Sequence, residues 1–366
     1  MSERFTAQDY AHMARALQLA ERGLNTTTPN PRVGCVIVRN GAVIGQGWHA
    51  RAGEPHAEIH ALLEAGDEAQ GATVYVTLEP CSHHGRTPPC ADALAEAGVG
   101  RVIAAMTDPN PQVSGNGLLR LQAAGIAVDS GLLEAEAKNL NEGFIKRMVH
   151  GHPFVRIKTA SSLDGKTALS NGQSKWITGD AARRDVHRLR ARSCAILTGV
   201  GTVITDDPQL NVRSVETPRQ PLKVIVDSQL RTPPTARMLA EGKTLIACAL
   251  PDARNTAALE ASGARILCLP QADGLVDLNA LLSRLAQMGI NEVMTEAGPT
   301  LTGALLAGGL VDEWVQYVAP VLLGDAARGL FRIAEPTAIA QRPAWHLVDS
   351  RQVGGDLRLT WRPAKP

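Results

Sequence analysis

The first stretch of the chain carries apolar residues at helical spacing. One buried helix face would be formed by Met13, Leu17 and Ala20. Thr6 and Asp9 precede these positions in the spacing of a capping box, and Gly23 follows as a stop signal. The pattern therefore predicts an opening helix that ends near Gly23.

A period of two then replaces the helical period. The apolar run VGCVIV from Val33 and the segment AVIGQGWH from Ala42 flank the pair Asn40-Gly41, which suits a type I′ turn and predicts a β-hairpin. The elements expected next alternate between helix and strand, as in a layered α/β domain. They are a helix over 56–65, a strand from residue 72, a helix over 91–97 and a strand from residue 101.

A change of pattern near residue 150 predicts a domain boundary. After a helix expected over 133–149, Gly151 and Pro153 interrupt the helical pattern before a new strand begins. We therefore expect one domain over 1–150 and a second α/β domain, with a mainly parallel sheet, over 151–366. Its strands are expected at 194–198, 222–227, 244–248, 265–269 and 292–296, and its helices at 180–191 and 278–288.

The length of the chain supports two domains, and its charge narrows the class of molecule that it is expected to bind. The 366 residues exceed the roughly 250–300 at which a single core stops growing. A net charge of +1, with scattered Lys and Arg, argues against a broad basic surface for nucleic acid and favours a small-molecule substrate. No export signal, no membrane-spanning run and six irregularly spaced cysteines predict a cytoplasmic protein with reduced thiols and no membrane partner.

One motif carries metal chemistry. His56, Cys81 and Cys90 offer one imidazole and two thiolates, a three-ligand zinc set that leaves the fourth tetrahedral position open for water. Zinc lowers the pKa of a bound water toward ~7, and Glu58 is the expected catalytic proton shuttle. Because residues two apart do not share a helix face, His56 and Glu58 are expected at a first helical turn.

The spacing of this motif carries a resemblance. H-x-E followed by two cysteines resembles the cytidine and deoxycytidylate deaminase superfamily. The longer insert SHHGRTPP, in the run EPCSHHGRTPPC, is similar to the pyrimidine deaminase half of the bacterial bifunctional riboflavin-biosynthesis family. TPNPRVGCVIV and RAGEPHAEIHAL extend the resemblance over residues 1 to about 150. It implies a cytidine-deaminase-like, three-layer domain.

Other residues that bear chemistry have plainer interpretations. Four cysteines are interpreted as core residues, namely Cys35, Cys194, Cys248 and Cys268. His49 and His60 are interpreted as structural. His83 and His84, in the polar insert, either line a substrate pocket or face solvent, and the sequence leaves both open.

The second half lacks the dinucleotide fingerprint of a Rossmann fold. LTGVGTVITDDP does not supply G-x-G-x-x-G at a strand-to-helix turn. EAGPTL does place a glycine at a strand end before a helix, and such an N-terminus binds phosphate well. Glycines that only make tight turns are the alternative.

A second resemblance extends over residues 151 to about 360. KTASSLDGKTAL, GQSKWIT, ARRDVHRLRA, ILTGVGTVITDDPQLNVR, VIVDS and EAGPTLTGALL resemble the reductase half of the same family. This implies a dihydrofolate-reductase-like α/β fold that uses NADPH. By match of motif, the NADPH site is lined by Ala160, Trp176, Thr202, Asp206, Ser228, Gly298, Pro299, Thr300, Leu301, Thr302, Gly303 and Ala304. The same match implies that the substrate is held by Ser174, Arg190, Leu210, Arg213 and Glu296.

Several charged residues of the second half have two possible interpretations, one functional and one structural. A guanidinium from Arg190 or Arg213 can grip a sugar phosphate bidentately, although a surface salt bridge is the other interpretation. That second interpretation weighs more for Arg183, Arg184 and Arg188. Asp164, before Gly165, fits a turn former better than a proton relay, and we assign it no catalytic role.

Together these features predict a bifunctional riboflavin-biosynthesis enzyme. It would deaminate 2,5-diamino-6-ribosylamino-4(3H)-pyrimidinone 5′-phosphate with Zn²⁺ and then reduce the ribosyl to a ribityl chain with NADPH, giving 5-amino-6-ribitylamino-uracil 5′-phosphate. The family suggests a homo-oligomer, dimer or tetramer. One alternative is a nucleic-acid or nucleotide deaminase with a non-catalytic nucleotide-binding second half, although 3% aromatic residues suit a strand groove poorly. The other is a non-catalytic zinc protein.

Overall fold

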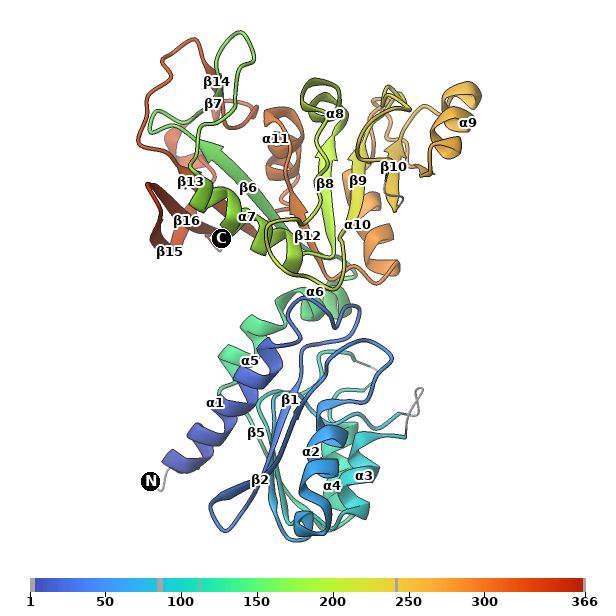
Figure 1. Cartoon of the computed structure of the whole chain (residues 1–366), viewed down its shortest axis with the longest axis vertical. Helices are drawn as coiled ribbons and strands as arrows, with labels where there is room; N and C mark the ends of the chain where they lie inside the picture. The colour runs from blue at the N-terminus through green and yellow to red at the C-terminus, as the bar shows by residue number, and fades with distance from the viewer. Residues whose placement is uncertain (1–3, 84–87, 112, 241–242, 365–366) are drawn as a thin grey trace. The chain divides into compact units, whose positions relative to one another are not determined.

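The chain folds into two compact units, Met1–His152 and Pro153–Pro366. The computed structural model describes residues 4–83, 88–111, 113–240 and 243–364 (Figure 1). Within those residues, no helix is both long enough and apolar enough to cross a membrane.

The first unit is built on a five-stranded sheet of order β2-β1-β3-β4-β5. Its strands are β1 (Gly34–Arg39), β2 (Ala42–Trp48), β3 (Thr73–Val76), β4 (Arg101–Ala104) and β5 (Ala127–Ser130). The predicted hairpin is confirmed, because β1 and β2 pair antiparallel and both Asn40 and Gly41 have positive φ. The pairs β3–β4 and β4–β5 are parallel.

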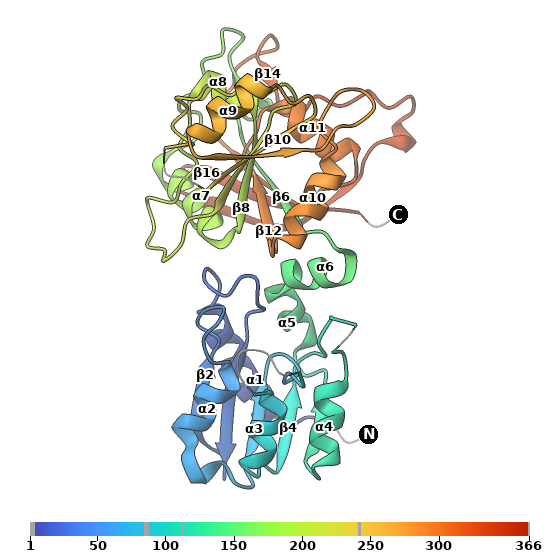
Figure 2. The ribbon, with the colours of Figure 1, turned by 90° about the vertical axis from the view of Figure 1, so that its right-hand side faces the viewer.

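Helices cover both faces of this sheet. They are α1 (Ala7–Glu21), α2 (Ala57–Ala65), η1 (Gly66–Ala69), α3 (Cys90–Glu96), α4 (Asn116–Ala123), α5 (Glu134–Leu140) and α6 (Glu142–His150). Figures 1 and 2 show α1 and α5 on one face, with α2, α3 and α4 on the other, so the unit has three layers. The predicted capping box of α1 is present, with Thr6 and Asp9 bonded reciprocally.

The single helix expected over 133–149 is wrong, because it breaks into α5 and α6 at Asn141. The buried Asn141 side chain accepts a hydrogen bond from the backbone N–H of Arg32 (2.8 Å) and donates one to its carbonyl oxygen (2.9 Å). Asn141 has φ −113°, outside helical geometry. A partner so far along the chain leaves no mark in the local helical pattern.

The second unit contains a nine-stranded sheet of order β11-β10-β9-β8-β12-β6-β13-β16-β15. Its strands are β6 (Phe154–Ser161), β8 (Ala195–Gly199), β9 (Leu222–Val226), β10 (Thr244–Cys248), β11 (Ala264–Cys268), β12 (Glu292–Thr295), β13 (Glu313–Val318), β15 (Trp345–Val353) and β16 (Asp356–Pro363). The pairs from β11 to β13 are parallel, as predicted, and β16 and β15 extend the sheet antiparallel. The strands β7 (Lys166–Ala168) and β14 (Arg328–Gly329) form a separate two-stranded sheet.

This large sheet is also covered on both faces (Figure 2). The helices are α7 (Asp180–Arg192), α8 (Val200–Asp206), α9 (Ala253–Ala261), α10 (Leu278–Gln287), α11 (Pro299–Ala307) and the short η2 (Ile339–Gln341). Leucines of α10 and α11 pack with Val155, Ala195 and Val293, whereas α7, α8 and α9 contribute to clusters on the other face. Because the parallel strands β6, β8, β9 and β12 end at one edge, the loops that follow them meet there, as ligand sites of α/β sheets require.

Candidate active sites

Three predicted ligands of the first unit converge in space. His56 is the N-cap of α2, Cys81 follows β3 by a short segment, and Cys90 begins α3. Their donor atoms all lie within 4.8 Å of one another. His56 Nδ1 lies 3.6 Å from the Sγ of Cys81 and 3.3 Å from that of Cys90.

The donor chemistry of this cluster fits zinc. A hydrogen bond with the Cys90 thiol, aided by His56 and opposed by burial, holds the pKa of the Cys81 thiol well below its usual value, whereas the same bond raises that of Cys90. The backbone N–H of Cys90 also donates to Cys81 Sγ (3.3 Å). Cys81 is therefore disposed to be a thiolate, the form that binds metal. One imidazole and two sulfurs match a zinc site that keeps a position for a reactant.

Glu58 lies in the first turn of α2 beside this cluster and is only 3% exposed. Burial raises the pKa of its carboxyl group to about 7, although the charge of His56 opposes the shift. Its Oε2 atom is buried without a hydrogen-bond partner. A buried carboxylate oxygen of this kind is available for a proton of a bound reactant.

Glu79 holds the segment that carries Cys81, a role that the sequence did not reveal. The buried carboxylate accepts backbone N–H groups, at 2.8–2.9 Å, from Asp108, Gly115 and Gly117. A Cβ atom on Gly117 would overlap the carbonyl oxygen of Pro80, so this close approach requires glycine. An acidic residue directly before a ligand motif is the only local signal of this anchor.

His49, which we expected to be structural, borders the metal cluster. Its buried ring meets that of His56 edge to face, with 5.2 Å between centroids. One ring nitrogen lies 3.0 Å from Asn30 Nδ2 and the other 3.2 Å from the carbonyl oxygen of Pro55. These contacts agree with the structural interpretation of His49, whose ring supports that of His56.

Among the described residues, the other histidines and cysteines that the sequence singled out lie outside the cluster of His56, Cys81 and Cys90. His83 is exposed after Cys81, and His84 lies outside the described residues. Three of the four expected core cysteines are buried, namely Cys35, Cys194 and Cys248. The prediction for Cys268 is wrong, since it is exposed at the end of β11, an edge strand of the sheet. An edge strand has a neighbouring strand on one side only, so its side chains are less enclosed than those of a central strand.

The predicted NADPH residues gather mostly at the carboxyl edge of the large sheet. Gly298 is the N-cap of α11, and a Cβ atom built on it would lie 4.0 Å from Thr202 Oγ1 in α8. A Cβ atom on Gly199 would lie 3.6 Å from Leu301 Cδ2. The turns after β8 and β12 therefore adjoin, beside a helix N-terminus suited to phosphate.

Other NADPH candidates differ in their surroundings. Ser228 follows β9, and its hydroxyl accepts the backbone N–H of Val276 (3.2 Å). Gly303 has a packing role, because a Cβ atom there would overlap the carbonyl oxygen of Arg332.

The remaining NADPH candidates lie on other elements. Ala160 lies near the end of β6, and Asp206 ends α8. The loop between β7 and α7 carries Ser174 and the 68% exposed Trp176, whose ring lies under the Arg183 guanidinium.

Two predicted substrate residues, Arg190 and Glu296, bind each other. Arg190 donates from Nε to Glu296 Oε1 (2.5 Å) and from Nη2 to Oε2 (3.0 Å). Lys158, which sequence reasoning missed, brings Nζ to 3.7 Å from the same carboxylate. Burial alone would raise the pKa of Glu296, but these cations lower it to about 2. Lys158 lies two positions before Ala160 on β6, a spacing that places both on one face.

Arg213 and Leu210 lie in the connection from α8 to β9. The Arg213 guanidinium is exposed and donates to Asn211 Oδ1 (3.1 Å). Leu210 is buried, with φ +47°. Asp164 lies in a turn, as interpreted, because the backbone N–H of Gly165 donates to the carbonyl oxygen of Ser162 (3.1 Å) and Gly165 has positive φ. Its carboxylate also accepts the backbone N–H groups of Leu323 and Gly324, which ties this turn to a distant segment.

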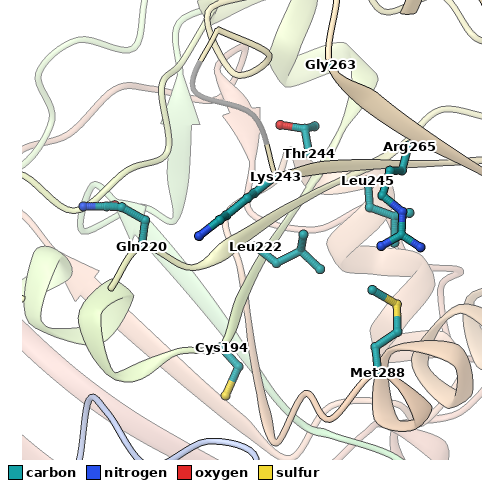
Figure 3. Close-up of a pocket in the computed structure, with 9 residues that line it drawn as sticks. All are labelled: Cys194, Gln220, Leu222, Lys243, Thr244, Leu245, Gly263, Arg265 and Met288. Atoms are coloured by element: carbon teal, nitrogen blue, oxygen red, sulfur yellow. The ribbon is translucent and has the colours of Figure 1, made fainter. Parts of the chain in front are cut away.

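A cavity of about 400 Å³ opens at the opposite edge of this sheet (Figure 3). It is lined by Cys194, Gln220, Leu222, Lys243, Thr244, Leu245, Gly263, Arg265 and Met288. Several of these residues precede or begin strands β8 to β11, so the cavity lies at their amino ends. It contains none of the residues predicted for NADPH or substrate.

Known proteins match both halves of the chain. The model of the cytidine and deoxycytidylate deaminase zinc-binding region matches residues 6–106, and that of the RibD C-terminal domain matches residues 153–359. The riboflavin biosynthesis protein RibD of Escherichia coli (strain K12) is 52% identical, over 96% of this chain and 98% of its own length.

Solved structures agree with this assignment and confirm the predicted fold class. Acinetobacter baumannii RibD, form 1, has 48% identity and a TM-score of 0.92, covering 98% of this chain and 99% of that one. A Thermotoga maritima protein titled diaminohydroxyphosphoribosylaminopyrimidine deaminase/5-amino-6-(5-phosphoribosylamino)uracil reductase has 33% identity and a TM-score of 0.85, with the same coverage. These full-length matches do not support the alternative with a non-catalytic second half. The chain therefore belongs to the RibD family, the bifunctional deaminases and reductases of riboflavin biosynthesis.

Proposed function

We propose that the first unit deaminates 2,5-diamino-6-ribosylamino-4(3H)-pyrimidinone 5′-phosphate, and that the second reduces the product to 5-amino-6-ribitylamino-uracil 5′-phosphate. The observation that carries this proposal is the convergence of His56, Cys81 and Cys90 beside the unpartnered carboxylate oxygen of Glu58. The name of the Thermotoga maritima relative supports the order of substrates, because it couples a diamino-pyrimidine deaminase with an aminouracil reductase.

In the deaminase site, His56, Cys81 and Cys90 would hold Zn²⁺, which supplies an activated water for hydrolysis of the ring amine. Glu58 is the proposed catalytic acid and base. Its buried Oε2 would take up a proton from the water and pass it toward the departing ammonia. A pKa of about 7 lets the same carboxyl group accept and release that proton near neutral pH. Glu79 would keep Cys81 in place through its backbone hydrogen bonds.

In the reductase site, NADPH would supply the hydride, and the protein would supply orientation and charge. The residues that we propose for NADPH are Ala160, Trp176, Thr202, Asp206, Ser228 and 298–304. Those that we propose for the substrate are Ser174, Arg190, Leu210, Arg213 and Glu296. The exposed guanidinium of Arg213 suits the sugar phosphate, whereas Glu296 acts by holding Arg190 and Lys158.

The partner and location predictions form part of the same proposal. A small-molecule substrate, rather than nucleic acid, fits the net charge of +1 and the 3% aromatic content. A homo-oligomer, dimer or tetramer, is supported by the edge strand β15, where Leu347 and Val348 are each 49% exposed. A cytoplasmic location is supported by the six cysteines, which are free thiols.

A paired assay tests the two activities and their order. Ammonia release and NADPH oxidation would be recorded with the diamino-pyrimidinone ribosyl phosphate, before and after zinc is removed. We expect both signals to disappear without zinc, and NADPH oxidation to return when the deaminated intermediate is added.

Ammonia release without any NADPH oxidation would contradict the proposed role of the second unit. Absence of both activities would favour the non-catalytic zinc protein. Deamination of single-stranded RNA in place of the pyrimidine would favour a nucleic-acid enzyme.

A further inference from the structure

The segment 211–213 has no helix or strand, yet side chains hold its backbone at every residue. Arg190 Nη1 donates to the carbonyl oxygen of Asn211 (3.0 Å). Gln220 accepts from Val212 N (2.7 Å) and donates to the Val212 carbonyl oxygen (2.9 Å). His187 Nδ1 accepts from Arg213 N (3.3 Å). Backbone groups of a surface connection usually bind water, so this arrangement fixes the segment unusually well.

The residue before this segment adds a second constraint. Leu210 has φ +47°, in the left-handed region that branched residues rarely adopt. Its side chain is buried among Val200, Val203 and Ile225. Strained backbone of this kind persists only where the surroundings determine it, and it concentrates at functional sites.

The same contacts connect the segment to the charged group at the end of β12. His187 and Arg190 lie three residues apart on α7, so both side chains face the segment from one side of the helix. Arg190 also holds Glu296 by two hydrogen bonds. The result is an exposed Arg213 guanidinium on a backbone that is fixed from α7 on one side and from Gln220 on the other.

We propose that His187 and Gln220 form a clamp that positions Arg213 for the phosphate of the reductase substrate. Both are positioning residues that act through the backbone of 212–213 and do not touch the substrate. This inference rests on the proposed function of the second unit, and it goes beyond that proposal by assigning two residues to phosphate affinity.

Burial, together with the cations around His187, keeps the imidazole neutral, which is the form that the clamp needs. Burial lowers its pKa to about 4, helped by Arg190, Arg213 and Lys158 and opposed by Glu296. Nδ1 therefore keeps its lone pair at neutral pH and accepts the Arg213 N–H. The clamp predicts a substrate KM that does not rise between pH 6 and 8, since the phosphate itself gains charge over that range. Direct contact of a protonated His187 with phosphate predicts a KM that rises with pH.

Gln220 offers a variant that spares the core. Figure 3 shows its side chain at one side of the cavity, across from Arg265 and Met288, and the residue is exposed. Gln220→Glu keeps the acceptor for Val212 N, but it sets a carboxylate oxygen against the Val212 carbonyl in place of the donor. Gln287→Glu is the matched control, because Gln287 is exposed on α10 and accepts a hydrogen bond from the Arg284 side chain (2.9 Å), away from the segment 211–213.

The test is steady-state kinetics of the reductase step, with the deaminated intermediate and with the same compound after removal of its phosphate. We expect Gln220→Glu and His187→Leu to raise the KM for the phosphorylated substrate roughly tenfold, the effect of one ordinary hydrogen bond. kcat, the KM for NADPH and the kinetics of the dephosphorylated compound should stay within about twofold. His187→Asn should restore affinity, because its amide oxygen accepts in place of Nδ1.

Several outcomes would overturn the clamp while leaving the reductase intact. They are equal effects on both compounds, a fall in kcat without a rise in KM, or a KM of the unaltered chain that rises with a histidine pKa. If His187→Leu does not fold, Gln220→Glu carries the same test. Absence of NADPH oxidation by the unaltered chain would overturn the proposed function itself.

Discussion

Arg190 holds Glu296 in a two-point grip, with Nε 2.5 Å from Oε1 and Nη2 3.0 Å from Oε2. This bidentate ion pair joins α7 to the turn after β12. Lys158 adds a second cation, with its Nζ 3.7 Å from Glu296 Oε2. Because the pKa of Glu296 falls to about 2, the carboxylate remains charged at any pH where an enzyme of this kind works. This charge contributes to the stability of the second unit, and in the proposed reductase site it would hold Arg190 and Lys158 in place.

Glu296→Gln should lower stability in a pH-dependent way. The folded pKa of Glu296 lies near 2, below the ordinary value of 4.5, so its ionisation contributes roughly 3 kcal/mol above pH 4.5. This contribution disappears as pH falls toward 2. Urea unfolding of the unaltered chain and the variant should show a constant gap from pH 7 to about 5 that narrows in more acidic solution. A gap that widens on acidification would contradict the assignment.

Arg190→Lys should impair the reductase step and spare the deaminase. A lysine ammonium is a point charge that does not reproduce the two-point grip together with the bond to Asn211 O. We expect NADPH oxidation with the deaminated intermediate to fall by a factor of ten or more, given the loss of charge-assisted bonds of about 1.5–3 kcal/mol each. Ammonia release serves as the internal control. Equal loss of both activities would indicate a general folding defect.

Glu58→Gln should keep the metal and lose ammonia release. The amide preserves the shape of the side chain, but it does not carry a proton between water and ammonia. We expect unchanged zinc content by metal analysis and a loss of at least a hundredfold in deamination. Glu68→Gln, an exposed position in η1, provides the same charge change away from the site. Undiminished ammonia release by Glu58→Gln would remove this residue from the mechanism.

Gly117→Ala should disturb the deaminase site through packing. The added Cβ would overlap the carbonyl oxygen of Pro80, next to Cys81, and would strain the loop bound by Glu79. We expect a stability loss of about 1–3 kcal/mol and weaker zinc retention. Gly355→Ala, where a Cβ would meet nothing within 4 Å, is the control. Normal zinc retention and stability in Gly117→Ala would show that the loop moves freely.

Local patterns were sufficient to predict the features that depend on neighbours in sequence. The capped helix α1, the Asn40-Gly41 turn and most parallel strands of the second unit follow from capping, turn chemistry and apolar periodicity. His56, Cys81 and Cys90 could be grouped because one imidazole and two thiolates are the donor set of a catalytic zinc site, and the structure brings their donor atoms within 4.8 Å of one another.

The missed features depend on partners far along the chain. Lys158 gains its meaning only beside Glu296, and Asn141 breaks a helix only because Arg32 lies against it. The hairpin of β15 and β16 has few buried positions, so its apolar alternation is weak. These features arise from tertiary contacts, which local sequence patterns do not encode.

The strand order of the second unit has a consequence for how the protein is made. The central strand β12 lies between β8 and β6, although both neighbours precede it by a long stretch of chain. During synthesis the middle of the sheet therefore stays open until residues 292–295 leave the ribosome, and only then do Arg190 and Lys158 meet their counter-ion. Such late, non-local closure favours slow folding of this unit as one cooperative step. Nascent chains that stop before β12 would expose apolar strand faces and depend on chaperones.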